Sequence, residues 1–269
     1  MLPLSVIVRC SEDLRVVDCL DSIDAECEVI GAITPDARVQ AELERRQLRY
    51  AVSPRGNPAA TTLAALPLAS NGTVVLIDSD CRFAPGAVRR LAALSQTADI
   101  VRPNIHFAAD GPSSRATAIA RTFQYTYCGF IYEPGLVVNL DRVVAAAGGY
   151  LFAPDAPFTP DGELDFRLRH SGAMDTLSIV TDPEVTLTHA PLSISRHFAS
   201  YWRYGLSEAT RMAFLGQPVL RTFLASLPAR YRAASSRPYP RRTVPIIAGC
   251  DTVYVVAMLV NYLRLKAAA

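Results

Sequence analysis

The sequence predicts an α/β fold in which a mainly parallel sheet is flanked by helices, with a helical C-terminal extension. Short runs rich in Val and Ile alternate with helical patterns through the first hundred residues, which is typical of a parallel sheet covered on both faces. Half of the 269 residues are apolar, so the chain can bury a full core. In such sheets ligands bind beyond the carboxyl ends of the strands.

Five apolar runs have the length and β-branched content of buried strands. They are residues 4–8, 28–33, 48–52, 73–77 and 99–101. Helices are predicted to begin at cap residues, or at prolines suited to a first turn. These starts lie near Val16, Asp36, Asn57 and Pro85, and two further helices are expected at 161–171 and 195–214.

The overall charge excludes one class of partner. The chain has 27 Lys and Arg against 25 Asp and Glu, so no broad positive field favours nucleic acid. The six cysteines are scattered without metal-ligand spacing, which favours reduced thiols over a zinc site or a disulfide framework. The first residues lack the basic start of a secretory signal, and we therefore expect a cytoplasmic protein.

The C-terminal region has two unusual segments. Residues 235–242 are basic and rich in Pro, as expected of a linker or a surface arm. Residues 244–265 are apolar for most of a membrane-spanning length, but they include Asp251, Asn261 and Arg264. We expect this tail to pack on the domain or to lie at the inner surface of a membrane, instead of spanning it.

A pair of acids follows one buried strand directly. Asp78 and Asp80 come after the run 73–77, at the edge where an α/β sheet binds ligands. Two neighbouring carboxylates repel each other unless a cation bridges them, and Mg²⁺ or Mn²⁺ does so while also holding phosphate oxygens. The alternative is that the two acids only end the strand and cap the next turn.

Several motifs, taken in order, resemble the inverting family-2 glycosyltransferases of the GT-A fold over residues 2–215. The matching segments are Ser5 to Val8, Cys19 to Ile23, Glu28 to Ile30, Asn71 to Asp80, Gly148 to Tyr150 and Asp161 to Gly172. Two short motifs, 189–191 and 203–205, are similar to the glycosyltransferases of the mycofactocin pathway. The resemblance implies transfer of a sugar from a nucleotide-diphosphate sugar to an acceptor hydroxyl, with Mg²⁺ or Mn²⁺ and with inversion.

The resemblance also implies a division of labour along the chain. Residues 1–102 would bind the nucleotide sugar, residues 103–215 would bind the acceptor and carry catalysis, and residues 216–269 would form a helical, partly apolar extension. The expected nucleotide-sugar ligands are Arg9, Ser11, Glu12, Thr34, Arg55, Asp78, Ser79 and Arg203. The expected metal ligands are Asp78, Asp80 and His189, and His189 is included because it ends a likely strand at 185–188 and can therefore reach the same edge of the sheet. The expected acceptor residues are Tyr132, Gly149 and Trp202.

Two positions depart from the family pattern. Arg9 stands where the family usually has a proline, and Thr34 stands near the position of its usual acid. These departures leave the base of the nucleotide open.

Three acids compete for the role of general base, which removes the proton from the acceptor hydroxyl. Counting back from Gly172 selects Asp161, whereas counting from Arg169 selects Glu163; Asp165 is the third candidate. The i, i+4 spacing also predicts an ion pair between Glu163 and Arg167, which we expect to be weak and at the helix surface. We take Asp161 as the base.

Other nucleotide-binding classes are disfavoured. A dinucleotide oxidoreductase or a methyltransferase is expected to have a Gly-x-Gly motif after its first strand, and residues 9–13 contain no glycine. The remaining rival is a non-catalytic module that binds a nucleotide sugar or a membrane surface. The altered acidic motif and the apolar tail favour that rival, and turnover of a donor distinguishes the two.

Overall fold

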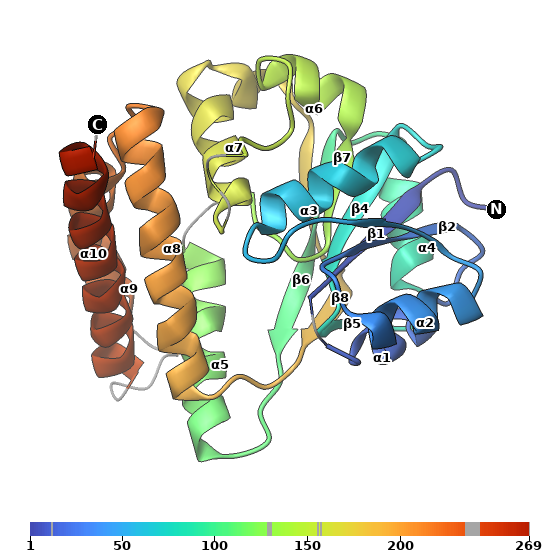
Figure 1. The fold of residues 1–269 in the computed structure, drawn as a ribbon, viewed down its shortest axis with the longest axis horizontal. Coiled ribbons are helices and arrows are strands. Elements are labelled where there is room, and N and C mark those ends of the chain that lie inside the picture. The colour runs from blue at the N-terminus through green and yellow to red at the C-terminus, as the bar shows by residue number, and fades with distance from the viewer. Residues whose placement is uncertain (12, 128–130, 155, 157, 235–242, 269) are drawn as a thin grey trace. The chain divides into compact units, whose positions relative to one another are not determined.

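The computed structural model describes residues 1–11, 13–127, 131–154, 156, 158–234 and 243–268 (Figure 1). The chain divides into two compact units. The first unit comprises Met1–His106 and Phe130–His189, and the second comprises Phe107–Gly129 and Ala190–Ala269.

Among the described residues, eight strands form one mixed sheet in the order β3-β2-β1-β4-β7-β6-β8-β5. The strands are β1 Ser5–Cys10, β2 Glu28–Ile33, β3 Arg49–Val52, β4 Thr73–Asp78, β5 Cys81–Phe83, β6 Ile100–Phe107, β7 Leu136–Asn139 and β8 Ile179–His189. Strands β3, β2, β1 and β4 are parallel, whereas β7 pairs antiparallel with β4 and β6, and β5 with β8. The predicted parallel pairing is therefore found in the half of the sheet that the N-terminal strands β1 to β4 form.

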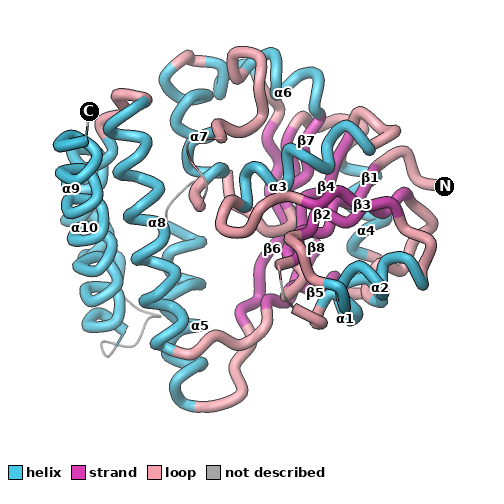
Figure 2. The backbone as a smooth tube through the Cα atoms, in the orientation of Figure 1, coloured by secondary structure: helices cyan, strands magenta, loops and turns pink. Residues whose placement is uncertain are grey.

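Helices surround the strands (Figure 2). Those of the first unit are α1 Val16–Asp21, α2 Ala37–Arg45, α3 Pro58–Ala65, α4 Ala87–Leu94, α6 Leu140–Ala146 and α7 Pro160–His170, with short 3-10 turns at Leu66–Leu68 and Ala173–Thr176. The predicted caps are confirmed for two of them. Asp36 accepts hydrogen bonds from two backbone amides at the start of α2, and Asn57 does so from the Ala60 amide at the start of α3, which has Pro58 in its first turn.

The sheet of the first unit buries apolar side chains on both faces because its residues alternate in direction. In β4, Val75 and Ile77 belong to a core formed with α1, α2 and α4. Val74 and Leu76 belong to a second core formed with α3, α6 and α7. These two layers confirm the α/β class with helices flanking the sheet.

The second unit contains α5 Pro112–Tyr127, α8 Ile194–Phe214, α9 Val219–Ala234 and α10 Thr243–Ala268. Helix α10 packs closely on α8, and a Cβ atom at Gly205 would lie 2.4 Å from the Tyr254 carbonyl oxygen and 2.8 Å from Ala257 Cβ. Glycine at this position therefore permits the close approach of the two helices. The predicted linker, residues 235–242, lies outside the described residues.

Helix α10 is the one described helix that is long and apolar enough to cross a membrane, and 33% of its most apolar 18-residue stretch is buried. Two of its polar residues have partners within the unit. Asp251 accepts hydrogen bonds from Arg230 Nη2 at 2.9 Å and from the Tyr231 hydroxyl at 3.1 Å, and Asn261 donates to the Leu206 carbonyl. The apolar tail thus packs on the helices of its own unit.

Candidate functional site

The parallel strands bring predicted nucleotide-sugar residues to one edge of the sheet. Arg9 of β1 and Asp78 of β4 are direct neighbours in the register of the two strands. The Ser79 amide donates to the Arg9 carbonyl at 2.8 Å, and the Thr34 amide donates to the Cys10 carbonyl at 3.1 Å. The ends of β1, β2 and β4 are thereby joined by backbone hydrogen bonds.

Arg9 is the centre of a charged cluster at this edge. Its Nε and Nη2 atoms both lie 2.7 Å from Asp78 Oδ1, and its Nη1 atom lies 2.8 Å from Glu133 Oε2. The Arg9 side chain is largely buried, and burial alone would lower its pKa, but the carboxylates of Asp78 and Glu133 outweigh this effect and raise the pKa above the ordinary value. The Asp78 carboxylate, which was predicted to bind metal and nucleotide sugar, therefore forms an ion pair with Arg9 of the neighbouring strand β1.

Sequence analysis did not identify Glu133. It precedes Pro134 and Gly135, at the entry to β7. Gly135 has a φ of 84°, and a Cβ atom there would lie 2.0 Å from Leu187 Cδ1, so only glycine fits this turn. The sequence does contain a signal for Glu133, because an acid followed by Pro-Gly and then an apolar run is typical of a turn that leads into a strand.

Asp161, at the start of α7, adjoins Glu133. Its carboxylate accepts hydrogen bonds from the Glu133 backbone amide at 3.2 Å and from the Gly162 backbone amide at 2.9 Å. Burial raises the pKa of Asp161, and it raises the pKa of Glu133 to about 7 against the opposing charge of Arg9. The Arg9 guanidinium pairs with Asp78 and Glu133, and Asp161 adjoins Glu133, so three acids gather around one cation.

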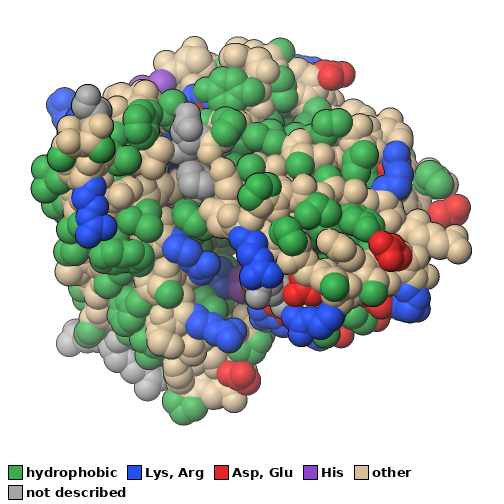
Figure 3. Space-filling model, in the orientation of Figure 1, with side chains coloured by type: hydrophobic (Ala, Val, Ile, Leu, Met, Phe, Trp, Pro, Cys, Tyr) green, Lys and Arg blue, Asp and Glu red, His purple; other side chains and the backbone are tan. Residues whose placement is uncertain are grey.

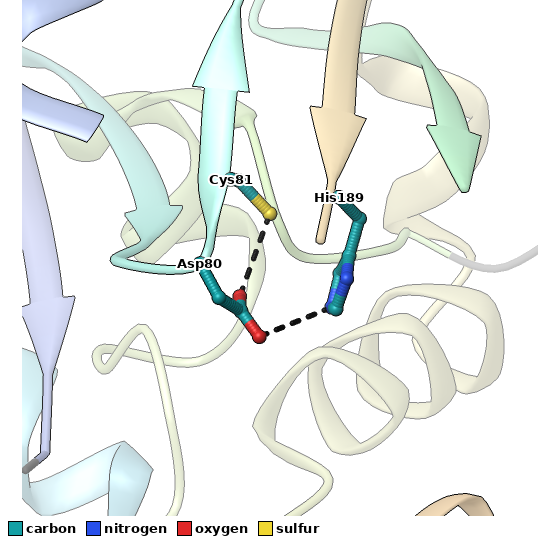
Figure 4. Close-up of side chains that lie close together, drawn as sticks. All are labelled: Asp80, Cys81 and His189. Carbon is teal, nitrogen blue, oxygen red and sulfur yellow. Dashed lines mark hydrogen bonds and ion pairs between the residues drawn. The ribbon is translucent and has the colours of Figure 1, made fainter. Parts of the chain in front are cut away.

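Asp80, in the turn between β4 and β5, approaches His189, at the end of β8 (Figure 4). His189 Nε2 lies 3.6 Å from Asp80 Oδ2, because β8 ends at His189 and pairs with β5 immediately after Asp80. The Cys81 thiol lies 3.7 Å from Asp80 Oδ1, and one potential ligand atom from each of the three residues falls within 4.8 Å of the others. Arg15 Nη2 also lies 3.7 Å from Asp80 Oδ2.

These donors fit a divalent ion. A carboxylate oxygen and an imidazole nitrogen supply two ligands, and ions such as Mg²⁺ and Mn²⁺ commonly take others from substrate phosphates and water. Asp80 is partly exposed, so phosphate oxygens can reach it. The predicted partners Asp80 and His189 thus lie together, whereas Asp78 is held by Arg9.

The other two candidate bases have buried carboxylates that are held in ion pairs. Glu163, whose side chain is fully buried, binds Arg167 at 2.7 and 2.9 Å. Asp165 binds Arg169 at 2.7 and 3.1 Å and also accepts the Ile131 amide. The expectation of a weak surface pair for Glu163 is wrong, because α7 turns that side chain into the core of the unit.

Arg167 connects this helix to the predicted acceptor turn. It donates to the backbone carbonyls of Ala147, Tyr150 and Leu151, and its guanidinium stacks 3.9 Å above the Tyr150 ring. Gly149 lies between these residues with a φ of 101°. The ion pair of Glu163 therefore fixes the turn as well as the helix.

The remaining predicted ligands lie in varied surroundings. Thr34 is buried, and its Oγ1 atom has no hydrogen-bond partner among the described residues, as expected of a group that meets a ligand. Arg55 donates to the Pro35 carbonyl at 3.0 Å, beside Thr34 in sequence. Ser11 is exposed, and Glu12 lies outside the described residues.

The predicted acceptor residues are divided between the units. Tyr132 is half-buried next to Glu133 in the first unit. Trp202 and Arg203 are exposed on α8 of the second unit, where Arg203 donates to the Ser200 hydroxyl. Their contribution to a sugar site stays a prediction.

Two solved structures are similar to this chain. Glucosyl-3-phosphoglycerate synthase from Mycobacterium tuberculosis, solved with Mn²⁺, UDP-glucose and phosphoglyceric acid, has 16% identity and a TM-score of 0.54, and the match covers 80% of each chain. S. aureus TarS 1–349 with UDP-GlcNAc matches at 13% identity and a TM-score of 0.49 over 98% of this chain and 92% of that one. No protein-family model and no curated protein sequence matches. The likeness to the synthase shows that this chain has the GT-A glycosyltransferase fold.

Proposed function

We propose that the chain is a metal-dependent glycosyltransferase that moves a sugar from a nucleotide-diphosphate sugar to an acceptor hydroxyl with inversion. The observation that carries this proposal is the meeting of Asp80 and His189 at a strand edge that is connected, through Arg9 and Glu133, to the carboxylate of Asp161. A binding edge and a candidate base are thus part of one continuous set of contacts in a GT-A fold.

Asp161 is the residue to which we assign general-base catalysis. Its carboxylate takes the proton of the acceptor hydroxyl as the oxygen attacks the anomeric carbon, and the bond from that carbon to the diphosphate breaks. Its raised pKa brings it closer to neutral pH, which favours proton transfer. A divalent ion held by Asp80 and His189 would neutralise charge on the departing diphosphate.

The finer assignments belong to the same proposal. Thr34, Ser79, Arg55, Ser11 and Glu12 of the first unit bind the nucleotide sugar. Tyr132 and Gly149 of the same unit contact the acceptor. We assign the chain to the cytoplasm, to family 2 of the glycosyltransferases and, within it, to the enzymes similar to those of the mycofactocin pathway, on the sequence motifs given above.

A non-catalytic nucleotide-sugar module is the second candidate. The observation that favours this candidate is that Glu163 and Asp165 each form an ion pair with an arginine, so that among the three candidate bases one is left for catalysis. The two candidates share donor binding and differ in turnover.

Binding of nucleoside diphosphates tests the site. We expect UDP or GDP to bind the full chain more tightly with Mn²⁺ than with EDTA, because an ion held by Asp80 and His189 would neutralise charge on the diphosphate. Asp80→Ala should weaken Mn²⁺-dependent binding by about tenfold or more, as measured by titration calorimetry. Asp175→Ala, which removes an exposed acid elsewhere in the same unit, should leave it unchanged. Equal affinity of the natural chain with and without EDTA would contradict the metal assignment.

A further inference from the structure

Helix α10 leaves an apolar stripe open to solvent. Val256, Leu259, Val260 and Leu263 are 46, 38, 36 and 67% exposed. At about 100° per residue these four positions fall on one side of the helix, opposite the buried Cys250 and the residues that pack on α8. A helix that is apolar on all sides is normally covered on all sides, so the open stripe needs an explanation.

Basic residues border this stripe. Arg264 and Lys266 are exposed and lie on either side of it by the same helical spacing. Asp251 is the single acid of α9 and α10, and it is buried and paired with Arg230. Hydrophobic side chains and Lys or Arg gather over α9 and α10 at the left of Figure 3.

The charge of the whole chain is divided in the same way. Residues 219–269 carry eight Lys or Arg and one acid, whereas residues 1–218 carry 19 Lys or Arg and 24 acids. A nearly neutral chain therefore has a strongly basic end, and this end carries the open apolar stripe. Apolar surface combined with local positive charge is complementary to an anionic lipid surface.

We propose that the α10 stripe, with its basic border, docks the second unit on the surface of an anionic lipid bilayer. The four apolar side chains enter the boundary between headgroups and acyl chains, and Arg264 and Lys266 extend to the lipid phosphates. This inference is independent of the proposed transferase chemistry, because vesicle binding requires neither donor nor acceptor.

The contacts of α10 determine how it lies on the membrane. A spanning helix would have to leave α8, opening the close packing at Gly205 and the hydrogen bond from Asn261. It would also carry Asp251 away from Arg230 and Tyr231, into hydrocarbon where an acid is costly. The helix therefore lies in the plane of the surface with its other side still on α8.

Vesicle flotation of the full chain tests this docking. We expect binding to phosphatidylcholine vesicles that contain phosphatidylglycerol, and weak binding to vesicles of phosphatidylcholine alone. Val256→Ser combined with Leu263→Ser should weaken partition by about tenfold or more. Arg264→Gln combined with Lys266→Gln should remove up to about 30-fold of the preference for anionic vesicles.

Val52→Ser is the matched control, because Val52 is also 46% exposed but belongs to the first unit. It should leave vesicle binding unchanged, and thermal melts establish that every variant is folded. Three outcomes would overturn the proposal: no binding to anionic vesicles, resistance to alkaline carbonate extraction as for a spanning helix, or a dimer in solution that the Val256 and Leu263 changes convert to a monomer.

Discussion

Asp161→Asn is expected to lower turnover of a nucleotide sugar by about 10² to 10⁴-fold while leaving donor affinity intact. The amide keeps the shape of the side chain, and its one oxygen can still accept one of the two hydrogen bonds that the carboxylate accepts, from the Glu133 amide at Oδ2 and from the Gly162 amide at Oδ1. It cannot take a proton from the acceptor hydroxyl. Steady-state turnover and calorimetric donor binding, measured on the same preparation, separate these two effects.

The control for this substitution is Asp175→Asn, an exposed acid-to-amide change that should keep turnover within about threefold, as is usual away from a site. Glu133→Gln is the informative comparison, because Glu133 also has a raised pKa but is ion-paired with Arg9. If Glu133→Gln lost turnover while Asp161→Asn kept it, Glu133 would be the base and the assignment of Asp161 would be wrong.

Glu163→Gln is expected to destabilise the first unit by about 3 to 5 kcal/mol, the usual result of removing one partner of a buried ion pair. The Glu163 side chain is fully buried, and its loss leaves the charge of Arg167 without a carboxylate. The turn at Gly149 should loosen as well, since Arg167 holds the carbonyls of Ala147 and Tyr150. Urea unfolding measures the change.

Glu184→Gln provides the comparison for an exposed pair. Glu184 contacts Arg90 at 2.8 Å, but its side chain is 71% exposed, so the urea midpoint should hardly change. If Glu163→Gln unfolded at the same urea concentration as the natural chain and yet lost turnover, Glu163 would be catalytic and its structural role would be refuted.

The local features of the fold were accessible from the sequence because they depend on neighbouring residues. The strand before Asp78 has an unbroken β-branched run, and the caps Asp36 and Asn57 directly precede their helices. Strands β5 and β7 were not predicted, since runs of three and four residues carry little pattern. Their antiparallel pairing gives the mixed sheet.

The part of the site that lies at the ends of strands could be predicted from the sequence. The placement of Asp80 and His189 followed from two strand ends, and the Glu163 pair followed from i, i+4 spacing. Spacing does not reveal burial, which is why that pair was expected at the surface. The contact of Arg9 with Glu133 joins residues 124 positions apart, and no local pattern encodes it.

Turnover of the donor is the most direct measurement of the central claim. The full chain would be incubated with Mn²⁺, hydroxyl acceptors and a panel of nucleotide sugars that includes UDP-glucose and UDP-N-acetylglucosamine. Release of nucleoside diphosphate would be followed, and the product would be analysed by NMR. We expect release that depends on Mn²⁺ and on Asp161, with a product of the opposite anomeric configuration. Donor binding without turnover for the whole panel, or a product that retains the donor's configuration, would contradict the account.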